Sequence, residues 1–200
     1  DSKDTPHPPI EAVFTVDEEV GMGGAAAICL DDLKGKMLLN LDTENEGVII
    51  AGCSGGFVDN VTIPVSRTEG KGSIVTIQVK GLRGGHSGLE IGEQRGNANK
   101  MAGRLLNHLN QTADISLISI DGGSADNVIT PACTVKVLTP DADAVIAGTK
   151  ELEENWISEF AGEEPGLQVL VEAEEGTAQV MDKASTLKVI HFVCNSPYGV

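Results

Sequence analysis

The chain has 200 residues, enough for one large domain or two small ones. Its formal net charge of -16 argues against a nucleic-acid partner, which needs clustered lysine and arginine. No apolar run approaches the roughly 20 residues that span a membrane, so we expect no membrane partner either. Aromatic residues make up only 3% of the sequence, and we therefore expect a core of valine, isoleucine, leucine and alanine.

The first predicted element is a buried β-strand over residues 10–16, where apolar and β-branched side chains follow one another. It ends at three consecutive carboxylates, Asp17, Glu18 and Glu19, and a short helix is predicted within residues 21–30. Carboxylates at the carboxyl end of a buried strand lie where open α/β sheets bind ligands, and a divalent cation relieves their mutual repulsion. The triplet alone predicts a cation site and a solvated acidic turn equally well.

Two further buried strands are predicted over residues 37–41 and 47–53. The first of them also ends in an acid, Asp42, whose carboxylate can therefore reach the same cation as the acidic triplet. The beginning of the chain thus resembles part of a parallel α/β sheet with two acidic strand ends on one side.

After Gly56 the pattern changes to that of antiparallel strands and amphipathic helices. Residues 60–66 and 73–80 alternate between apolar and polar side chains, as half-exposed antiparallel strands do. The elements that follow are predicted as a helix over 97–109, strands over 115–120 and 132–138, a helix over 141–160, a strand over 167–172 and a helix over 186–194. From residue 73 to 172 the order is β-α-β-β-α-β, the split-βαβ or ferredoxin-like arrangement of a two-layer sandwich.

The residue types at two places suit the hydrolysis of an amide. Glu18 and Glu19 project to opposite sides if the strand continues through them, so one can hold a metal ion while the other acts on a metal-bound water. His86 lies in Gly-Gly-His-Ser-Gly, where the glycines leave the imidazole uncrowded and let a ligand approach the backbone. Solvated acids and a lone surface histidine are the structural alternatives.

The four cysteines show no Cys-x-x-Cys spacing, so they predict neither a zinc ribbon nor a thioredoxin-like site. We interpret them as small buried hydrophobic residues in a reducing compartment, and the sequence shows no signal peptide. They are Cys29, Cys53, Cys133 and Cys194.

Four segments occur in a consistent order. They are Thr-Val-Asp-Glu-Glu-Val-Gly at 15–21, Asn-Leu-Asp-Thr-Glu-Asn-Glu-Gly at 40–47, Gly-Leu-Arg-Gly-Gly-His-Ser-Gly at 81–88 and Gly-Asn-Ala-Asn-Lys at 96–100. Together they resemble the bacterial aminoacyl-histidine (Xaa-His) dipeptidases, which belong to zinc metallopeptidase family twenty. The likeness runs through most of the chain.

The resemblance implies a two-domain enzyme that hydrolyses dipeptides, preferably those with a C-terminal histidine. Residues 1–55 are then part of a zinc-exopeptidase α/β catalytic, metal-binding domain, and residues 56–200 are a ferredoxin-like lid or dimerisation domain. The resemblance further implies two divalent cations, zinc with cobalt or manganese as alternatives, a homodimer joined through the lid, and a location in the cytoplasm.

The resemblance also implies a role for each matching residue. Glu18 is then the general base that acts on the attacking water. Glu19 binds one metal ion, and Asp42 binds the other. His86 polarises the scissile carbonyl or stabilises its oxyanion, in dimeric members from the neighbouring subunit, and Asn127 holds the carboxylate of the substrate.

The sequence departs from the family at both ends. Residues 1–16 lack the family's His-x-Asp motif and its metal-bridging acid, and the last histidine ligand and a lid arginine are expected beyond Val200. Because zinc sites need three or four ligands, we expect this chain to be a fragment that binds zinc weakly and does not hydrolyse dipeptides by itself. The alternatives are a lid-derived dimerisation or binding module without catalysis, and an acyl-amino-acid deacylase or carboxypeptidase of the same superfamily.

Overall fold

The computed structural model describes residues 5–41, 46–52 and 55–199. The chain divides into two compact units, Asp1–Gly56 and Phe57–Val200, and each unit is described by itself.

The first unit contains little regular structure. Its helices among the described residues are one turn of α-helix, α1 (Gly23–Ala26), and one 3-10 turn, η1 (Leu30–Asp32). The strands expected over 10–16 and 37–41 are not formed, and neither is a strand in the described part of 47–53. An apolar segment becomes a strand only when a neighbouring strand takes its backbone hydrogen bonds, and the described residues of this unit form no such ladder.

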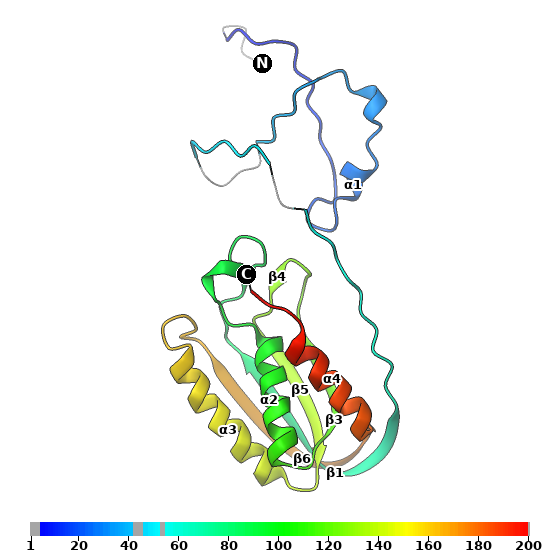
Figure 1. The fold of residues 1–200 in the computed structure, drawn as a ribbon, viewed down its shortest axis with the longest axis vertical. Coiled ribbons are helices and arrows are strands. Elements are labelled where there is room, and N and C mark those ends of the chain that lie inside the picture. The colour runs from blue at the N-terminus through cyan, green and yellow to red at the C-terminus, as the bar shows by residue number, and fades with distance from the viewer. Residues whose placement is uncertain (1–4, 42–45, 53–54, 200) are drawn as a thin grey trace. The chain divides into compact units, whose positions relative to one another are not determined.

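The second unit is built on a four-stranded antiparallel sheet of order β3-β5-β1-β6 (Figure 1). A separate two-stranded sheet joins β2 to β4. The strands are β1 (Arg67–Lys80), β2 (Gly85–His86), β3 (Ser116–Gly122), β4 (Val128–Ile129), β5 (Cys133–Thr139) and β6 (Gln168–Met181).

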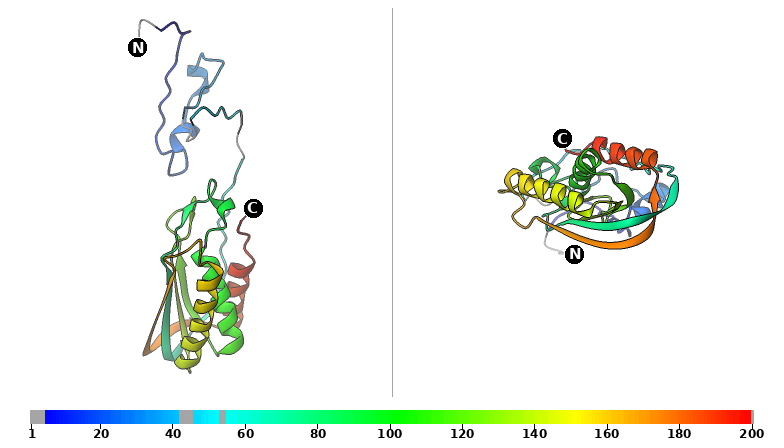
Figure 2. Two further views of the ribbon diagram at one scale, coloured as in Figure 1. Left: turned by 90° about the vertical axis from the view of Figure 1, so that its left-hand side faces the viewer. Right: turned by 90° about the horizontal axis from the view of Figure 1, so that it is seen from below.

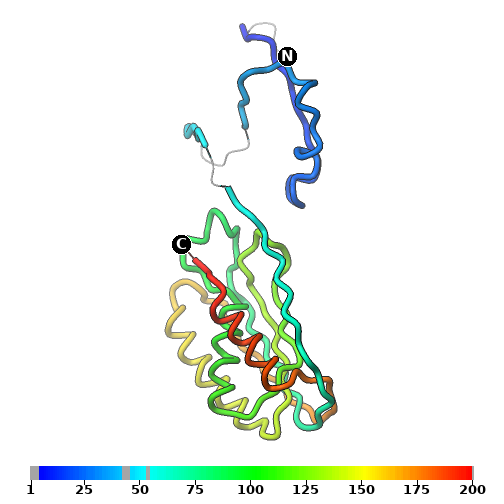
Figure 3. Tube along the Cα trace, turned by 45° about the vertical axis from the view of Figure 1, so that its right-hand side comes forward, coloured from blue at the N-terminus to red at the C-terminus, as the bar shows by residue number. Residues whose placement is uncertain are grey.

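Three helices cover one face of this sheet, and the described residues of the second unit place no helix on the other face (Figures 1 and 2). They are α2 (Ala98–Thr112), α3 (Ala142–Glu159) and α4 (Lys183–Asn195). α2 lies between the other two and contacts both, and Figure 3 shows α4 running beside it. Each helix begins at a residue whose side chain accepts a backbone N–H of the first turn, namely Asn97, Asp141 and Asp182.

The order of the long elements, β1-α2-β3-β5-α3-β6, and their positions in the sheet confirm the ferredoxin-like prediction and the mixed α/β class. Two boundaries differ from expectation. Residues 60–66 are not a strand, because β1 finds its partner β6 only from Arg67 onward. β6 continues well beyond residue 172, since each of its residues has an opposite residue on β1 that fixes the strand despite the acidic sequence.

The core lies between the sheet and the helices. On β1, Val75, Ile77 and Val79 face the helices and are at most 1% exposed, as the alternation of the sequence predicts. Leu105 and Leu109 of α2 are fully buried against them. Burial of each such side chain contributes about 1.5–3 kcal/mol, so this layer contact holds the unit together.

The edge strand β3 is irregular, and a side chain of β1 binds its backbone. It carries a bulge between Leu117 and Ser119. The guanidinium of Arg67 donates hydrogen bonds to the carbonyl oxygens of Ile118 and Gln179, at 2.9 and 3.0 Å. Because β3 and β6 are the two ends of the order, this bridge links the edges of a sheet that does not close into a barrel.

The cysteines described by the structure are free thiols. Cys133 is buried, which raises the pKa of its thiol to about 11, and Cys194 is half-buried. Cys29 is exposed, so the prediction that it is buried is wrong, because the described residues of the first unit form no core around it. Cys53 lies outside the described residues. No helix of the described residues is both long enough and apolar enough to cross a bilayer.

Candidate active site

His86 lies on β2, outside the main sheet. β2 pairs antiparallel with β4, so that Gly85 is opposite Ile129 and His86 is opposite Val128. This small sheet and the loop over residues 87–96 project from the same end of the sandwich (Figure 1). His86 is exposed there, and a ligand can reach its imidazole.

Asn127 immediately precedes β4 and therefore lies beside the His86 segment. The backbone N–H of Ser87 donates a hydrogen bond of 2.9 Å to the carbonyl oxygen of Asn127. Asn127 as a residue is half-buried. Two of the residues singled out from the sequence, far apart along the chain, are thus brought together by the pairing of β2 with β4.

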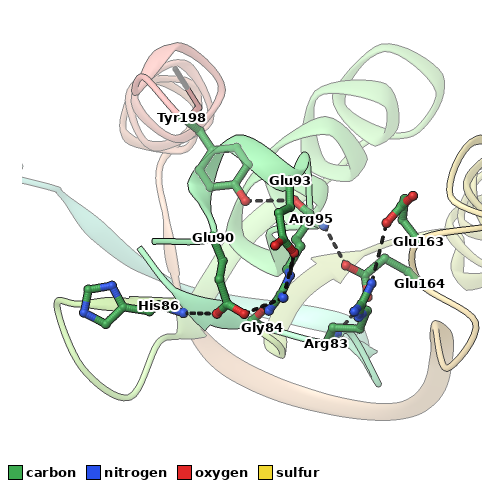
Figure 4. A network of polar contacts seen from close by, with 10 residues as sticks. Arg83, Gly84, His86, Glu90, Glu93, Arg95, Glu163, Glu164 and Tyr198 are labelled. Carbon is green, nitrogen blue, oxygen red and sulfur yellow. Dashed lines mark hydrogen bonds and ion pairs between the residues drawn. The ribbon is translucent and has the colours of Figure 1, made fainter. Parts of the chain in front are cut away.

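The loop after His86 fixes the orientation and the tautomer of its ring. The backbone N–H groups of Gly88 and Leu89 both donate to Nδ1, at 3.0 and 3.2 Å. A nitrogen that accepts hydrogen bonds carries no proton, so the proton of the neutral ring is on Nε2. Nε2 is therefore a hydrogen-bond donor, and Figure 4 shows the ring pointing away from the polar network behind it.

That network begins with Glu90 and Arg95. The carboxylate of Glu90 accepts the backbone N–H of His86 at 2.6 Å and forms an ion pair with Arg95. The His86 hydrogen bond is the main cause that lowers the pKa of Glu90, and Arg95 lowers it further. Arg95 also donates to the carbonyl oxygen of Gly84 at 2.7 Å and pairs with Glu93 (Figure 4).

Two glycines of the motif are needed for this geometry. Gly85 has φ +134°, and a side chain on it would collide with both Arg95 and Glu90. A Cβ on Gly88 would lie 3.2 Å from Cε1 of His86, a tight contact that would require the ring to shift by a few tenths of an ångström.

The structure adds a residue that the sequence did not single out, Glu164, in the turn between α3 and β6. It is only 3% exposed. Its carboxylate accepts the backbone N–H groups of Arg83 and Gly96, each at 2.7 Å (Figure 4). In the sequence it stands next to the exposed Glu163, and no pattern distinguishes the two.

The acidic residues of the first unit have a different setting. Glu18 and Glu19 are exposed in a turn where the carbonyl oxygen of Asp17 accepts the N–H of Met22 at 2.6 Å. Asp42 lies outside the described residues. Among the residues described, no three histidine, cysteine, aspartate or glutamate side chains converge on a point that could hold a metal ion. The described carboxylates alone therefore do not fit a zinc centre, which needs three or four ligands.

Comparison with known proteins gives a consistent result. Residues 77–155 match the M20 peptidase dimerisation domain. The chain is 31% identical over 198 residues to the cytosol non-specific dipeptidase of Escherichia coli K12, a match that covers 97% of this chain and 41% of that protein. Its structure is similar to the crystal structure of aminoacylhistidine dipeptidase from Vibrio alginolyticus, with a TM-score of 0.64 and 33% identity over 93% of this chain and 39% of that one.

These matches confirm the resemblance and the fold class expected from the motifs. The chain spans about two fifths of the length of both relatives.

Proposed function

Since residues 77–155 carry an M20 peptidase dimerisation domain and the chain resembles two dipeptidases along most of its length, we propose that it is part of a dipeptidase. The substrates proposed are dipeptides, with those ending in histidine preferred, as the name of the Vibrio relative suggests. The observation that carries the proposal is the fixed imidazole of His86, which offers its Nε2–H to a ligand, on a segment whose backbone is hydrogen-bonded to that of Asn127.

Hydrolysis of a peptide bond passes through a tetrahedral intermediate with negative charge on the former carbonyl oxygen. An imidazole whose Nε2–H is already held in place can donate a hydrogen bond to that oxygen without having to reorient. We assign this role to His86, and we assign to the amide of Asn127 the recognition of the carboxylate at the end of the dipeptide. Loss of one oxyanion donor costs about 10²–10³-fold in kcat.

In this proposal Glu18 takes the proton from the attacking water and returns it to the leaving amine, as a general base and then a general acid. Glu19 and Asp42 are proposed as ligands of two divalent cations, zinc with cobalt or manganese as alternatives, which would polarise the carbonyl when bound. Because two carboxylates do not complete such a site, the proposal needs further ligands, and we expect them from outside residues 1–200.

Two alternatives predict different behaviour. The first alternative is a lid-derived dimerisation or binding module without catalysis. It is favoured for the isolated chain because its described residues form no three-ligand metal cluster. An acyl-amino-acid deacylase or carboxypeptidase would use the same His86 and Asn127 on a different acyl group. The match to a dimerisation domain supports a homodimer joined through the second unit, and the name of the Escherichia coli relative supports a cytoplasmic location.

The test is zinc-dependent hydrolysis of glycyl-histidine and β-alanyl-histidine. It compares this chain with the same chain extended at both ends by the flanking residues of the Escherichia coli dipeptidase. We expect activity in the extended chain alone. We expect its loss in Glu18→Gln, a fall of about 10²–10³-fold in kcat in His86→Ala, and little change in His191→Ala, an exposed histidine of α4 that serves as the control.

Hydrolysis of acylated amino acids in place of dipeptides would move the assignment to the deacylase. Activity in neither chain would favour the module without catalysis. Activity of the chain without extension would contradict the ligand count.

A further inference from the structure

One buried carboxylate holds together the two ends of the loop that carries His86. We call these two ends, Arg83 and Gly96, the neck of the loop. One end of the loop is Arg83, three residues after the end of β1, and the other is Gly96, immediately before Asn97, the N-cap of α2. The N–H groups of both residues donate to Glu164, one to each carboxylate oxygen, at 2.7 Å. Glu164 therefore holds the two ends of the loop together from the α3–β6 turn, an element far away in the sequence (Figure 4).

The position of Glu164 makes these hydrogen bonds effective. Hydrogen bonds from backbone N–H groups to a carboxylate are roughly twice as strong as neutral ones, and water competes little at a side chain that is only 3% exposed. Both oxygens accept hydrogen bonds from the neck and the side chain is only 3% exposed, so we do not place Glu164 among the groups that contact the substrate. It acts on the site only through the loop.

The neck is connected to His86 by a short series of contacts. Arg95, the neighbour of Gly96, donates to the carbonyl oxygen of Gly84, the neighbour of Arg83. The same guanidinium pairs with Glu90, which accepts the backbone N–H of His86. A displacement of either end of the neck therefore moves the groups that hold the His86 backbone.

The C-terminal segment contacts the loop next to Gly96, at Arg95. The hydroxyl of Tyr198 donates to the carbonyl oxygen of Arg95 at 2.8 Å (Figure 4). The carboxylate of the neighbouring Glu163 forms an exposed ion pair with Arg83, with N···O 3.5 Å and more than half of its side chain exposed. Exposed ion pairs of this kind contribute little, so the two adjacent glutamates differ sharply in their connection to the loop.

We propose that Glu164 is the positioning residue of this site, which closes the neck of the loop over residues 83–96 and so fixes the His86 ring with its Nε2–H outward. The catalytic meaning of this role rests on the proposed function of His86. The positioning itself can be tested without any activity.

The test is NMR of the 200-residue chain, with the tautomer of His86 and the hydrogen exchange of individual amides as readouts. Glu164→Gln keeps the size of the side chain, but its NH₂ group would face one of the two N–H donors. We expect the amides of Arg83 and Gly96 to exchange about tenfold faster or more. The amides of His86, Gly88 and Leu89 should also exchange faster, and both tautomers of His86 should become populated.

Three comparisons make the result specific. Glu163→Gln, the adjacent control, should leave all these signals unchanged. Glu90→Gln should accelerate exchange at His86 while the two neck amides stay protected. Glu164→Asp, which keeps the charge but is too short to reach both donors, should resemble Glu164→Gln, and protected amides of α2 report that each variant is folded.

An unchanged exchange rate and tautomer of His86 in folded Glu164→Gln or Glu164→Asp would overturn the proposal. Unfolding of α2 in both would also overturn it, since Glu164 would then support the whole unit and not this loop. In the extended chain, Glu164→Gln should lower kcat with little change in KM while Glu163→Gln does not. An extended chain that is inactive without substitution would refute the proposed function and leave the NMR result standing.

Discussion

The two units of this chain contain similar apolar segments but use them in opposite ways. In the first unit Phe14 is 93%, Leu39 84% and Ile49 96% exposed, whereas Leu105 and Leu109 of the second are fully buried. The apolar residues of the second unit belong to strands and helices that cover one another, and those of the first have no such partner among its described residues. Apolar content alone therefore does not produce a core, because burial requires a second layer.

We expect the largest difference between the two units when a leucine in each is replaced by alanine and the free energy of unfolding is compared. Leu105→Ala removes a fully buried side chain from α2 and should lower the free energy of unfolding by about 2–5 kcal/mol. Leu39→Ala, the matched change in the first unit, should alter it by less than about 0.5 kcal/mol. Urea unfolding followed by the fluorescence of Trp156, the single and fully buried tryptophan, measures both. Equal effects would show that the first unit also contributes to a core.

A second, smaller effect concerns backbone groups that side chains satisfy inside the second unit. The buried hydroxyl of Thr186 accepts the N–H of Leu117 at 3.2 Å. Thr186→Val keeps the shape but leaves that N–H unsatisfied, which should cost about 1–3 kcal/mol.

The matched control for this change is Thr149→Val, in the same unit. The Thr149 hydroxyl is equally buried but only donates to the carbonyl oxygen of Val145 one helical turn earlier. We expect a change of less than about 0.5 kcal/mol, because that oxygen keeps its helical hydrogen bond. A similar loss in both variants, measured by urea unfolding, would mean that packing of the hydroxyl matters more than the N–H of Leu117.

The smallest effect is a pH dependence at the start of α4. The backbone N–H of Ser185 donates to the carboxylate of Asp182 at 2.7 Å, and this hydrogen bond lowers the pKa of Asp182 below its ordinary value. A carboxyl with a lowered folded-state pKa stabilises the fold above its unfolded pKa, and that stabilisation is lost as the pH falls through the folded value.

Asp182→Asn keeps a side-chain oxygen that can cap the helix but removes the charge. The wild-type chain should therefore be the more stable one at pH 7, and the difference should shrink below about pH 4. Urea unfolding from pH 7 to 2.5 measures it. A difference that stays constant over this range would show that the charge of Asp182 contributes nothing.

Much of the second unit could be predicted because its patterns are local. The alternation of Val75, Ile77 and Val79 and the helical spacing of Met101, Leu105 and Leu109 each report which face is buried. The glycines around His86 likewise indicated an uncrowded imidazole, and His86 is exposed. The prediction of strands in the first unit was wrong because an apolar run indicates burial but does not identify the neighbour against which it is buried.

By itself, the sequence determined the ferredoxin-like order of the second unit, its periodic faces, and the chemical types of the candidate residues. The tertiary structure alone decided that β6 continues beyond its apolar run, that β2 and β4 bring the segments of His86 and Asn127 side by side, and that Glu164 rather than Glu163 closes the loop. The physical reason is that strand pairing and hydrogen bonds between distant residues depend on the packing of whole elements, which no local pattern of side chains encodes.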